Sequence, residues 1–150
     1  MEKLQKITIE TFDQKETYAL GQRLGEKARP GMIVTLDGDL GAGKTLFAQG
    51  VAAGLGITEP VNSPTFTILQ EYTDGRMPMY HFDVYRIEEP EEMDEIGYED
   101  CFFGEGISLV EWADMIDELI PAEAVRIRLE RVPEKGDNYR KITIEGMEEI

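Results

Sequence analysis

The chain has 150 residues, of which 41% are hydrophobic and 31% charged, and its formal net charge is −16. This length and composition predict a globular protein with a buried core, and the charge weighs against tight direct binding to nucleic acid, which needs clustered Lys and Arg. No apolar run approaches the roughly 18 residues of a membrane span, and the single cysteine, Cys101, cannot form an internal disulfide. We therefore expect a cytoplasmic protein that makes no contact with a membrane.

The apolar pattern predicts strands and helices that alternate along the chain. In chain order, we expect a strand around Ile7 and Ile9, a helix over 17–27 with Asp13 as its N-cap, a strand over 32–36, a helix from 46 to about 55, strands over 66–72 and 79–85, short helical pieces within 90–103, a strand over 107–110, a short helix over 115–120, and strands over 125–131 and 140–145. No repeat or linker divides the chain, so residues 1–150 are predicted to form a single domain. Cys101 is interpreted as a small apolar residue.

Residues 38–45 match G-x-x-x-x-G-K-[ST], the loop that holds the phosphates of ATP or GTP. Its glycines let the backbone curl so that successive N–H groups point at phosphate oxygens. Lys44 places a cation on the β- and γ-phosphates, and the Thr45 hydroxyl can bind Mg²⁺. The alternative is an ordinary glycine-rich turn. The residues predicted to bind the nucleotide here are Gly38, Gly41, Ala42, Gly43, Lys44, Thr45 and Leu46.

Strands interleaved with helices around this loop predict an α/β fold, a P-loop NTPase-like three-layer sandwich with a mixed, largely parallel sheet. Antiparallel members are expected at residues 66–85 and near the ends of the chain. The guanine-reading pattern N-K-x-D is absent from the sequence, which favours ATP over GTP.

Two acids are candidates for the chemistry that follows phosphate binding. Glu111 comes directly after an apolar strand, at the carboxyl end where open α/β sheets bind ligands. Asp83 lies in an aromatic-rich strand, where a carboxylate is costly to bury without a cation or hydrogen-bond donors. Each could instead be a surface carboxylate or a hydrogen-bonded structural one.

His81 and Trp112 are the only histidine and the only tryptophan of the chain, and both lie near these acids in sequence. Strand geometry puts His81 on the same face as Asp83, and we favour a packed, hydrogen-bonded histidine over a functional one. Trp112 directly follows Glu111. It either packs in the core or has a functional role, in which it covers the site or contacts a partner.

Two further segments leave alternatives open. The loop over 62–65 is either a plain turn or a switch region in which a hydroxyl senses Mg²⁺ and the γ-phosphate. Residues 88–100 contain eight acids and no base, and they form either a solvated face or a docking surface for a basic partner.

Taken together, the motifs resemble the bacterial TsaE (YjeE) family, the small ATPases of tRNA threonylcarbamoyladenosine biosynthesis. The matching segments, in the family's order, are Gly38 to Thr45, Ser63-Pro64-Thr65-Phe66-Thr67, Tyr80-His81-Phe82-Asp83-Val84-Tyr85-Arg86 and Leu109-Val110-Glu111-Trp112. The resemblance covers about residues 5–145 and is least distinctive after Pro121.

The resemblance implies a Mg²⁺-dependent ATPase in which Lys44 and the loop amides hold ATP while Thr45 and Glu111 coordinate Mg²⁺. It implies that Asp83 and Trp112 matter for activity, that Thr65 belongs to a loop near the γ-phosphate, and that Thr11 lies near the nucleotide. It also implies a partner, the TsaD–TsaB complex, which modifies tRNA at position 37. ATP hydrolysis by this protein would support the turnover of that complex. Contact with tRNA would then be indirect.

Two other functions share the phosphate loop. A small-molecule kinase would also bind ATP, but it usually has an arginine-bearing lid and an acceptor pocket, and arginines are sparse between Arg29 and Arg126. A non-catalytic sensor would bind ATP only to set its affinity for a partner.

Overall fold

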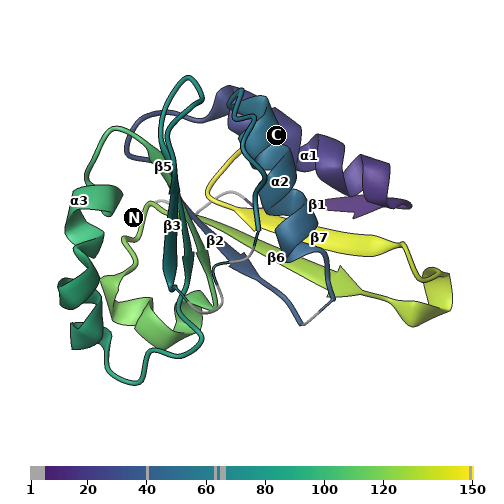
Figure 1. Ribbon diagram of the computed structural model, residues 1–150. Coiled ribbons are helices and arrows are strands. Elements are labelled where there is room, and N and C mark those ends of the chain that lie inside the picture. Colours follow the sequence, from purple (N-terminus) through teal and green to yellow (C-terminus); the bar gives the residue numbers. More distant parts are fainter. Residues whose placement is uncertain (1–5, 40, 63, 65–66, 149) are drawn as a thin grey trace.

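The protein is described by a computed structural model that covers residues 6–39, 41–62, 64, 67–148 and 150 (Figure 1). Its strands are β1 (Lys6–Thr11), β2 (Ile33–Asp37), β3 (Leu69–Tyr72), β4 (Met79–Asp83), β5 (Ile107–Glu111), β6 (Val125–Arg131) and β7 (Arg140–Glu145). The α-helices are α1 (Gln14–Lys27), α2 (Lys44–Gly54) and α3 (Tyr98–Phe102), and the 3₁₀ helices are η1 (Pro90–Ile96), η2 (Ala113–Leu119) and η3 (Pro133–Lys135).

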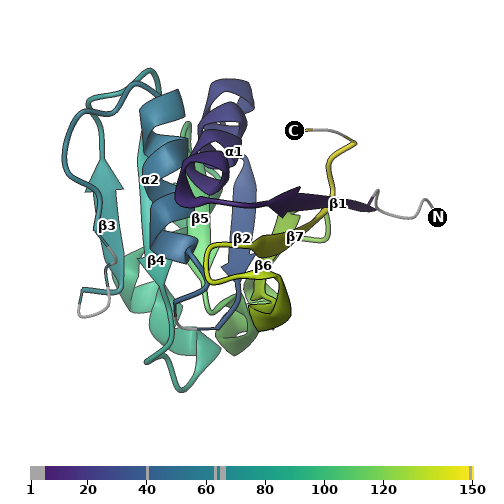
Figure 2. The same ribbon diagram turned by 90° about the vertical axis from the view of Figure 1, so that its right-hand side faces the viewer.

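The seven strands form one mixed sheet in the order β1-β7-β6-β2-β5-β4-β3 (Figures 1 and 2). The four central strands β6, β2, β5 and β4 run parallel to one another. At one side β7 is antiparallel to both β6 and β1, and at the other β3 is antiparallel to β4. The predicted α/β fold with a mixed sheet is confirmed, with the parallel pairing confined to the centre.

Helices cover both faces of this sheet, which gives three layers (Figure 1). On one face, α1 and α2 contribute Leu20, Leu24 and Phe47 to a core that includes Leu109 of β5. On the other, the core contains residues of η1, α3 and η2 together with Val110 of β5. Leu109 and Val110, which are successive residues of β5, thus point into different cores, and this explains why every position of this central strand is buried.

Glycines bring α1 and α2 into close contact. A Cβ added at Gly21 or Gly25 of α1 would collide with backbone carbonyls of α2, and one added at Gly50 or Gly54 of α2 would collide with carbonyls of α1. Each helix therefore presents two glycines, four residues apart, on the face that meets its neighbour. The close approach fixes α1 against the helix that begins at the phosphate loop.

Most of the predicted elements are present, with changes at their ends. Helix α1 begins at Gln14 rather than 17, because the Asp13 side chain caps it by accepting a hydrogen bond from the Glu16 N–H at 2.8 Å. Strand β3 begins at Leu69, and β4 ends at Asp83, where a turn follows. The short helix expected over 115–120 is the 3₁₀ helix η2, and α2 begins two residues earlier than predicted.

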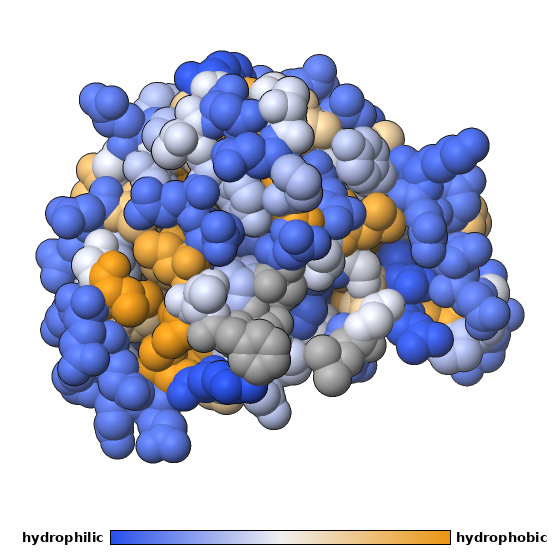
Figure 3. Space-filling view, in the orientation of Figure 1, coloured by the Kyte–Doolittle hydropathy of each residue, from blue (hydrophilic) through white to orange (hydrophobic). Residues whose placement is uncertain are grey.

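The acidic segment over 88–100 carries η1 and the start of α3. One of its acids has a structural role, because the Glu92 carboxylate accepts hydrogen bonds from the N–H groups of Glu88 and Glu89, both at 2.8 Å. These bonds hold the pKa of the Glu92 carboxyl below its ordinary value. Figure 3 shows a largely hydrophilic surface with hydrophobic side chains exposed beside α3. Partner docking on this segment remains a prediction.

None of the helices in the described part of the chain is long and apolar enough to cross a membrane.

The glycine contact between α1 and α2 predicts that Gly50→Ala destabilises the protein. Helix propensity alone favours alanine by up to about 1 kcal/mol, but the new methyl group would collide with the Tyr18 carbonyl oxygen, and overpacking of this kind costs about 1–3 kcal/mol. Urea unfolding should show a lower free energy of unfolding. Glu26→Ala, an exposed change on α1, is the control and should have little effect.

Burial of Cys101 predicts an unreactive thiol. Cys101 belongs to α3 and its side chain lies in the core, where burial raises the pKa of the thiol to about 11. The reactive thiolate is therefore scarce at pH 8. Iodoacetamide should alkylate the native protein far more slowly than the protein unfolded in guanidinium chloride, and equal rates would contradict this prediction.

Candidate functional site

The phosphate loop joins the end of β2 to the start of α2. Gly38, Gly41 and Gly43 have positive φ values of 147°, 79° and 101°, a conformation that side chains other than glycine rarely adopt. Gly43 is the N-cap of α2 and supplies no side-chain cap, and the first turn of the helix contains no acid. The first N–H groups of α2 thus keep their partial positive charge for an anion.

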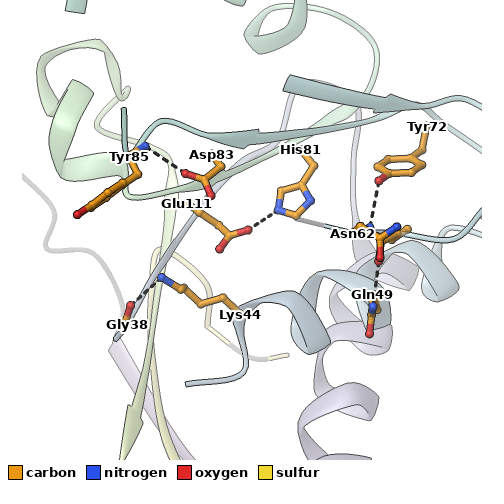
Figure 4. A network of polar contacts seen from close by, with 10 residues as sticks. Gly38, Lys44, Gln49, Asn62, Tyr72, His81, Asp83, Tyr85 and Glu111 are labelled. Atoms are coloured by element: carbon orange, nitrogen blue, oxygen red, sulfur yellow. Dashed lines mark hydrogen bonds and ion pairs between the residues drawn. The ribbon is translucent and has the colours of Figure 1, made fainter. Parts of the chain in front are cut away.

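Lys44 lies across this loop. Its side chain is buried, and its Nζ donates a hydrogen bond to the Gly38 carbonyl at 2.7 Å (Figure 4). The same Nζ lies 4.1 Å from the centre of the Trp112 ring, which is a cation–π contact. The ammonium group therefore connects the first residue of the loop with the end of β5.

The two candidate acids end neighbouring parallel strands. Asp83 of β4 and Glu111 of β5 are paired in register, and Glu111 is also paired with Leu36 of β2, next to the phosphate loop. Both carboxylates are almost completely buried, with exposed fractions of 6% and 3%. Asp83 accepts a hydrogen bond from the Tyr85 N–H at 3.1 Å, and it turns the chain after β4. The alternative that either acid is a surface carboxylate is therefore excluded.

His81 is a packed, hydrogen-bonded strand histidine, as favoured from the sequence. It is fully buried, and its Nε2 lies 2.6 Å from Oε2 of Glu111 (Figure 4). Its partner is thus a side chain of the candidate site rather than the backbone of the sheet.

Trp112 lies at the wall of the site. It adopts a left-handed backbone conformation with φ 62°, which is uncommon and strained for a residue other than glycine. This turn carries the indole back over Lys44 and against the ring of Tyr85, whose centre is 4.8 Å away. Of the alternatives for Trp112, the structure supports a cover over the site.

These groups surround a cavity of about 630 Å³, a size typical of small-molecule sites. Thr45, Leu46 and both acids line it together with Lys44. Its lining also contains residues that sequence reasoning did not assign to the site: Gln14, Thr17, Arg86, Asn138 and Arg140.

Arg140, the first residue of β7, makes the most extensive contact with the loop. Its Nε donates to the Ala42 carbonyl at 2.8 Å and its Nη2 to the Gly41 carbonyl at 3.2 Å, while its Nη1 bonds the Asp137 and Tyr139 carbonyls. Burial, with a smaller effect of the nearby Arg131 charge, lowers the pKa of the Arg140 guanidinium. The contact joins residues 98 and 99 positions apart in the sequence, so no local pattern could have revealed it.

Two predicted nucleotide contacts are not tested by this geometry. Thr11 is buried, and its hydroxyl lies 2.7 Å from that of Thr17, which lines the cavity. Thr65 lies outside the described residues, as does Ser63 of the same loop. The first residue of that loop, Asn62, is held by a hydrogen bond from its N–H to the Tyr72 hydroxyl at 3.3 Å.

A magnesium ion fits the donor set of this site. Within the described residues, no cluster of three or more His, Cys, Asp and Glu side chains could hold a metal ion. Mg²⁺ is usually held by one or two carboxylates, hydroxyls, waters and substrate phosphates rather than by an all-protein cage. Thr45 and Glu111 offer oxygen donors of this kind, and a cation would offset two adjacent buried carboxylates.

The sheet order and the glycine loop define a P-loop α/β protein. The model of the family "Threonylcarbamoyl adenosine biosynthesis protein TsaE" matches residues 11–142. The TsaE protein of Bacillus subtilis strain 168 is 47% identical over 93% of this chain and 85% of its own, and that of Nostoc is 48% identical over 73% and 70%. The crystal structure of Bacillus subtilis YdiB superimposes with a TM-score of 0.82 at 41% identity, covering 97% of this chain and 88% of that one. The chain therefore belongs to the TsaE family.

The Arg140 contact predicts a loop whose order depends on β7. In Arg140→Gln, the hydrogen bonds to the Gly41 and Ala42 carbonyls are lost, and charged hydrogen bonds contribute about 1.5–3 kcal/mol each. Hydrogen exchange at the Ala42 amide, which is bonded to the Asp39 carbonyl, should become at least about tenfold faster.

Arg128→Gln is the matched control, because Arg128 is exposed on the neighbouring strand and its side chain forms an ion pair with Glu130. Unchanged exchange at Ala42 in the Arg140 variant would show that the loop is ordered without this contact.

Proposed function

We propose that this protein is a Mg²⁺-dependent ATPase that acts with the TsaD–TsaB complex in threonylcarbamoyladenosine modification of tRNA position 37. Membership of the TsaE family supports the place in this modification. One observation carries the ATPase activity: glycines of the phosphate loop, Lys44 and the buried carboxylates of Asp83 and Glu111 all line the same cavity.

Binding begins at the loop. The free N–H groups of α2 and the ammonium group of Lys44 hold the β- and γ-phosphates. To do so, Lys44 gives up its hydrogen bond to the Gly38 carbonyl and bonds phosphate oxygens instead. Thr45 and Glu111 would hold Mg²⁺ by their hydroxyl and carboxylate oxygens. When bound, the metal neutralises the negative charge on the phosphate oxygens.

Hydrolysis needs a water placed in line with the bond between the γ-phosphorus and its bridging oxygen. The oxygen of that water attacks the γ-phosphorus, the bridging oxygen leaves with ADP, and inorganic phosphate is released. Asp83 is our candidate to orient the water, because its carboxylate is paired in register with Glu111 and lines the same cavity. Trp112 and Tyr85 close the wall beside Lys44 and limit access of bulk water.

The net charge of −16 fits a protein that assists a tRNA enzyme without binding tRNA itself. In this proposal the protein works in the cytoplasm, and its contact with tRNA is made only through TsaD–TsaB. ATP hydrolysis supports turnover of that complex rather than the transfer of the threonylcarbamoyl group.

The test separates binding from turnover. Lys44→Ala removes the ammonium group from the phosphates, so ATP affinity measured by calorimetry should fall about tenfold or more. Glu111→Ala should retain ATP binding but lose phosphate release, measured with TsaD–TsaB present. Lys27→Ala and Glu118→Ala, exposed residues of the same kinds outside the cavity, are the matched controls.

Wild-type protein that hydrolyses no ATP above background with its partners would contradict the ATPase role. Binding without phosphate release in a single turnover would instead identify a nucleotide sensor. ATP-dependent phosphorylation of a metabolite would identify a kinase.

A further inference from the structure

The hydrogen bond between His81 and Glu111 joins two buried side chains on neighbouring strands. The exposed fractions of the two residues are 0% and 3%, and Nε2 lies 2.6 Å from Oε2. His81 lies on β4, two residues before Asp83, and its register partner is Leu109, two residues before Glu111. The imidazole therefore reaches Glu111 from behind, on the side away from the end of the strands (Figure 4).

The other ring nitrogen determines how this bond is made. His81 Nδ1 is buried and has no hydrogen-bond partner among the described residues. A proton on Nδ1 would be an unpaired buried donor, whereas a proton on Nε2 is donated to a carboxylate. Nε2 is therefore the nitrogen that donates, and its hydrogen bond goes to Oε2 of Glu111.

We infer that His81 is a positioning residue, which fixes the Glu111 carboxylate in the orientation that binds a divalent cation. Glutamate has three side-chain torsions, and a free carboxylate would lose their entropy whenever it bound a metal. The His81 bond fixes these torsions in advance and leaves Oε1 for the ion. A hydrogen bond from a side chain behind a metal ligand orients that ligand toward the ion.

This inference rests on the proposed function, because it assigns Glu111 to the metal. It adds a residue that makes no contact with either the metal or the nucleotide. A histidine with a purely packing role would influence folding stability alone, whereas a positioning residue influences the affinity for the cation.

The experiment compares two amides at position 81. The Nε2 of glutamine can reach the place of the histidine Nε2 and donate to Glu111, whereas the amide of asparagine ends near the place of Nδ1 and cannot reach it. With ADP present, Mn²⁺ affinity measured by electron paramagnetic resonance should stay near the wild-type value in His81→Gln. It should fall about tenfold or more in His81→Asn. ADP affinity without metal should be the same in both variants.

Met79→Val is the matched control, because Met79 is a fully buried residue of β4 on the same face as His81, and its register partner Ile107 lies four residues before Glu111. It should lower the melting temperature and leave Mn²⁺ affinity unchanged. If His81→Asn does not fold, His81→Leu takes its place, since it keeps most of the volume and removes the donor.

The outcomes separate this inference from the function on which it rests. Glu111→Gln should also weaken Mn²⁺ binding. If it does so while His81→Gln and His81→Asn (or His81→Leu) bind Mn²⁺ equally well, the positioning role is wrong and the function stands. If Glu111→Gln binds Mn²⁺ as the wild type does, or if the wild type does not bind ADP, the proposed function itself is wrong.

Discussion

The site depends on the parallel pairing of β2, β5 and β4. Because these strands run in the same direction, their carboxyl ends meet at one edge of the sheet, and the phosphate loop follows the first of them directly. The register places Glu111 beside Leu36 on one side and beside Asp83 on the other. A shift of one residue would turn these acids to the opposite face, so the same hydrogen bonds that build the sheet also assemble the site.

An acidic protein that holds an anion must create a positive region locally. Net charge is −16, yet the cavity is lined by Lys44, Arg86 and Arg140, and the uncapped start of α2 contributes its N–H groups. Arg140 is engaged with backbone carbonyls of the loop, so its charge lies next to the phosphate site while its hydrogen bonds hold the loop. Electrostatics at this range depend on the nearest groups rather than on the total charge.

Rigidity around the cavity has two different sources. Glycines at the contact between α1 and α2 let the helices approach until backbones touch, and this brings Gln14 and Thr17 at the start of α1 to the cavity wall. On the opposite side the strain of Trp112 is offset by contacts of its indole with Lys44 and Tyr85. Strained residues of this kind persist where the surrounding structure overdetermines them, as it does at the end of β5.

The sequence alone determined the elements, the class of fold and the loop, because helices, strands and glycine turns are encoded in local patterns. It also identified Glu111, which follows an apolar strand, and Asp83, an acid within an aromatic-rich strand. Only the tertiary structure decided that Asp83 and Glu111 are neighbours, that His81 bonds Glu111, and that Trp112 covers Lys44. Arg140 could not be found in advance, because it reaches Gly41 and Ala42 from about a hundred residues away, and such contacts follow from strand order and register, which no local pattern records.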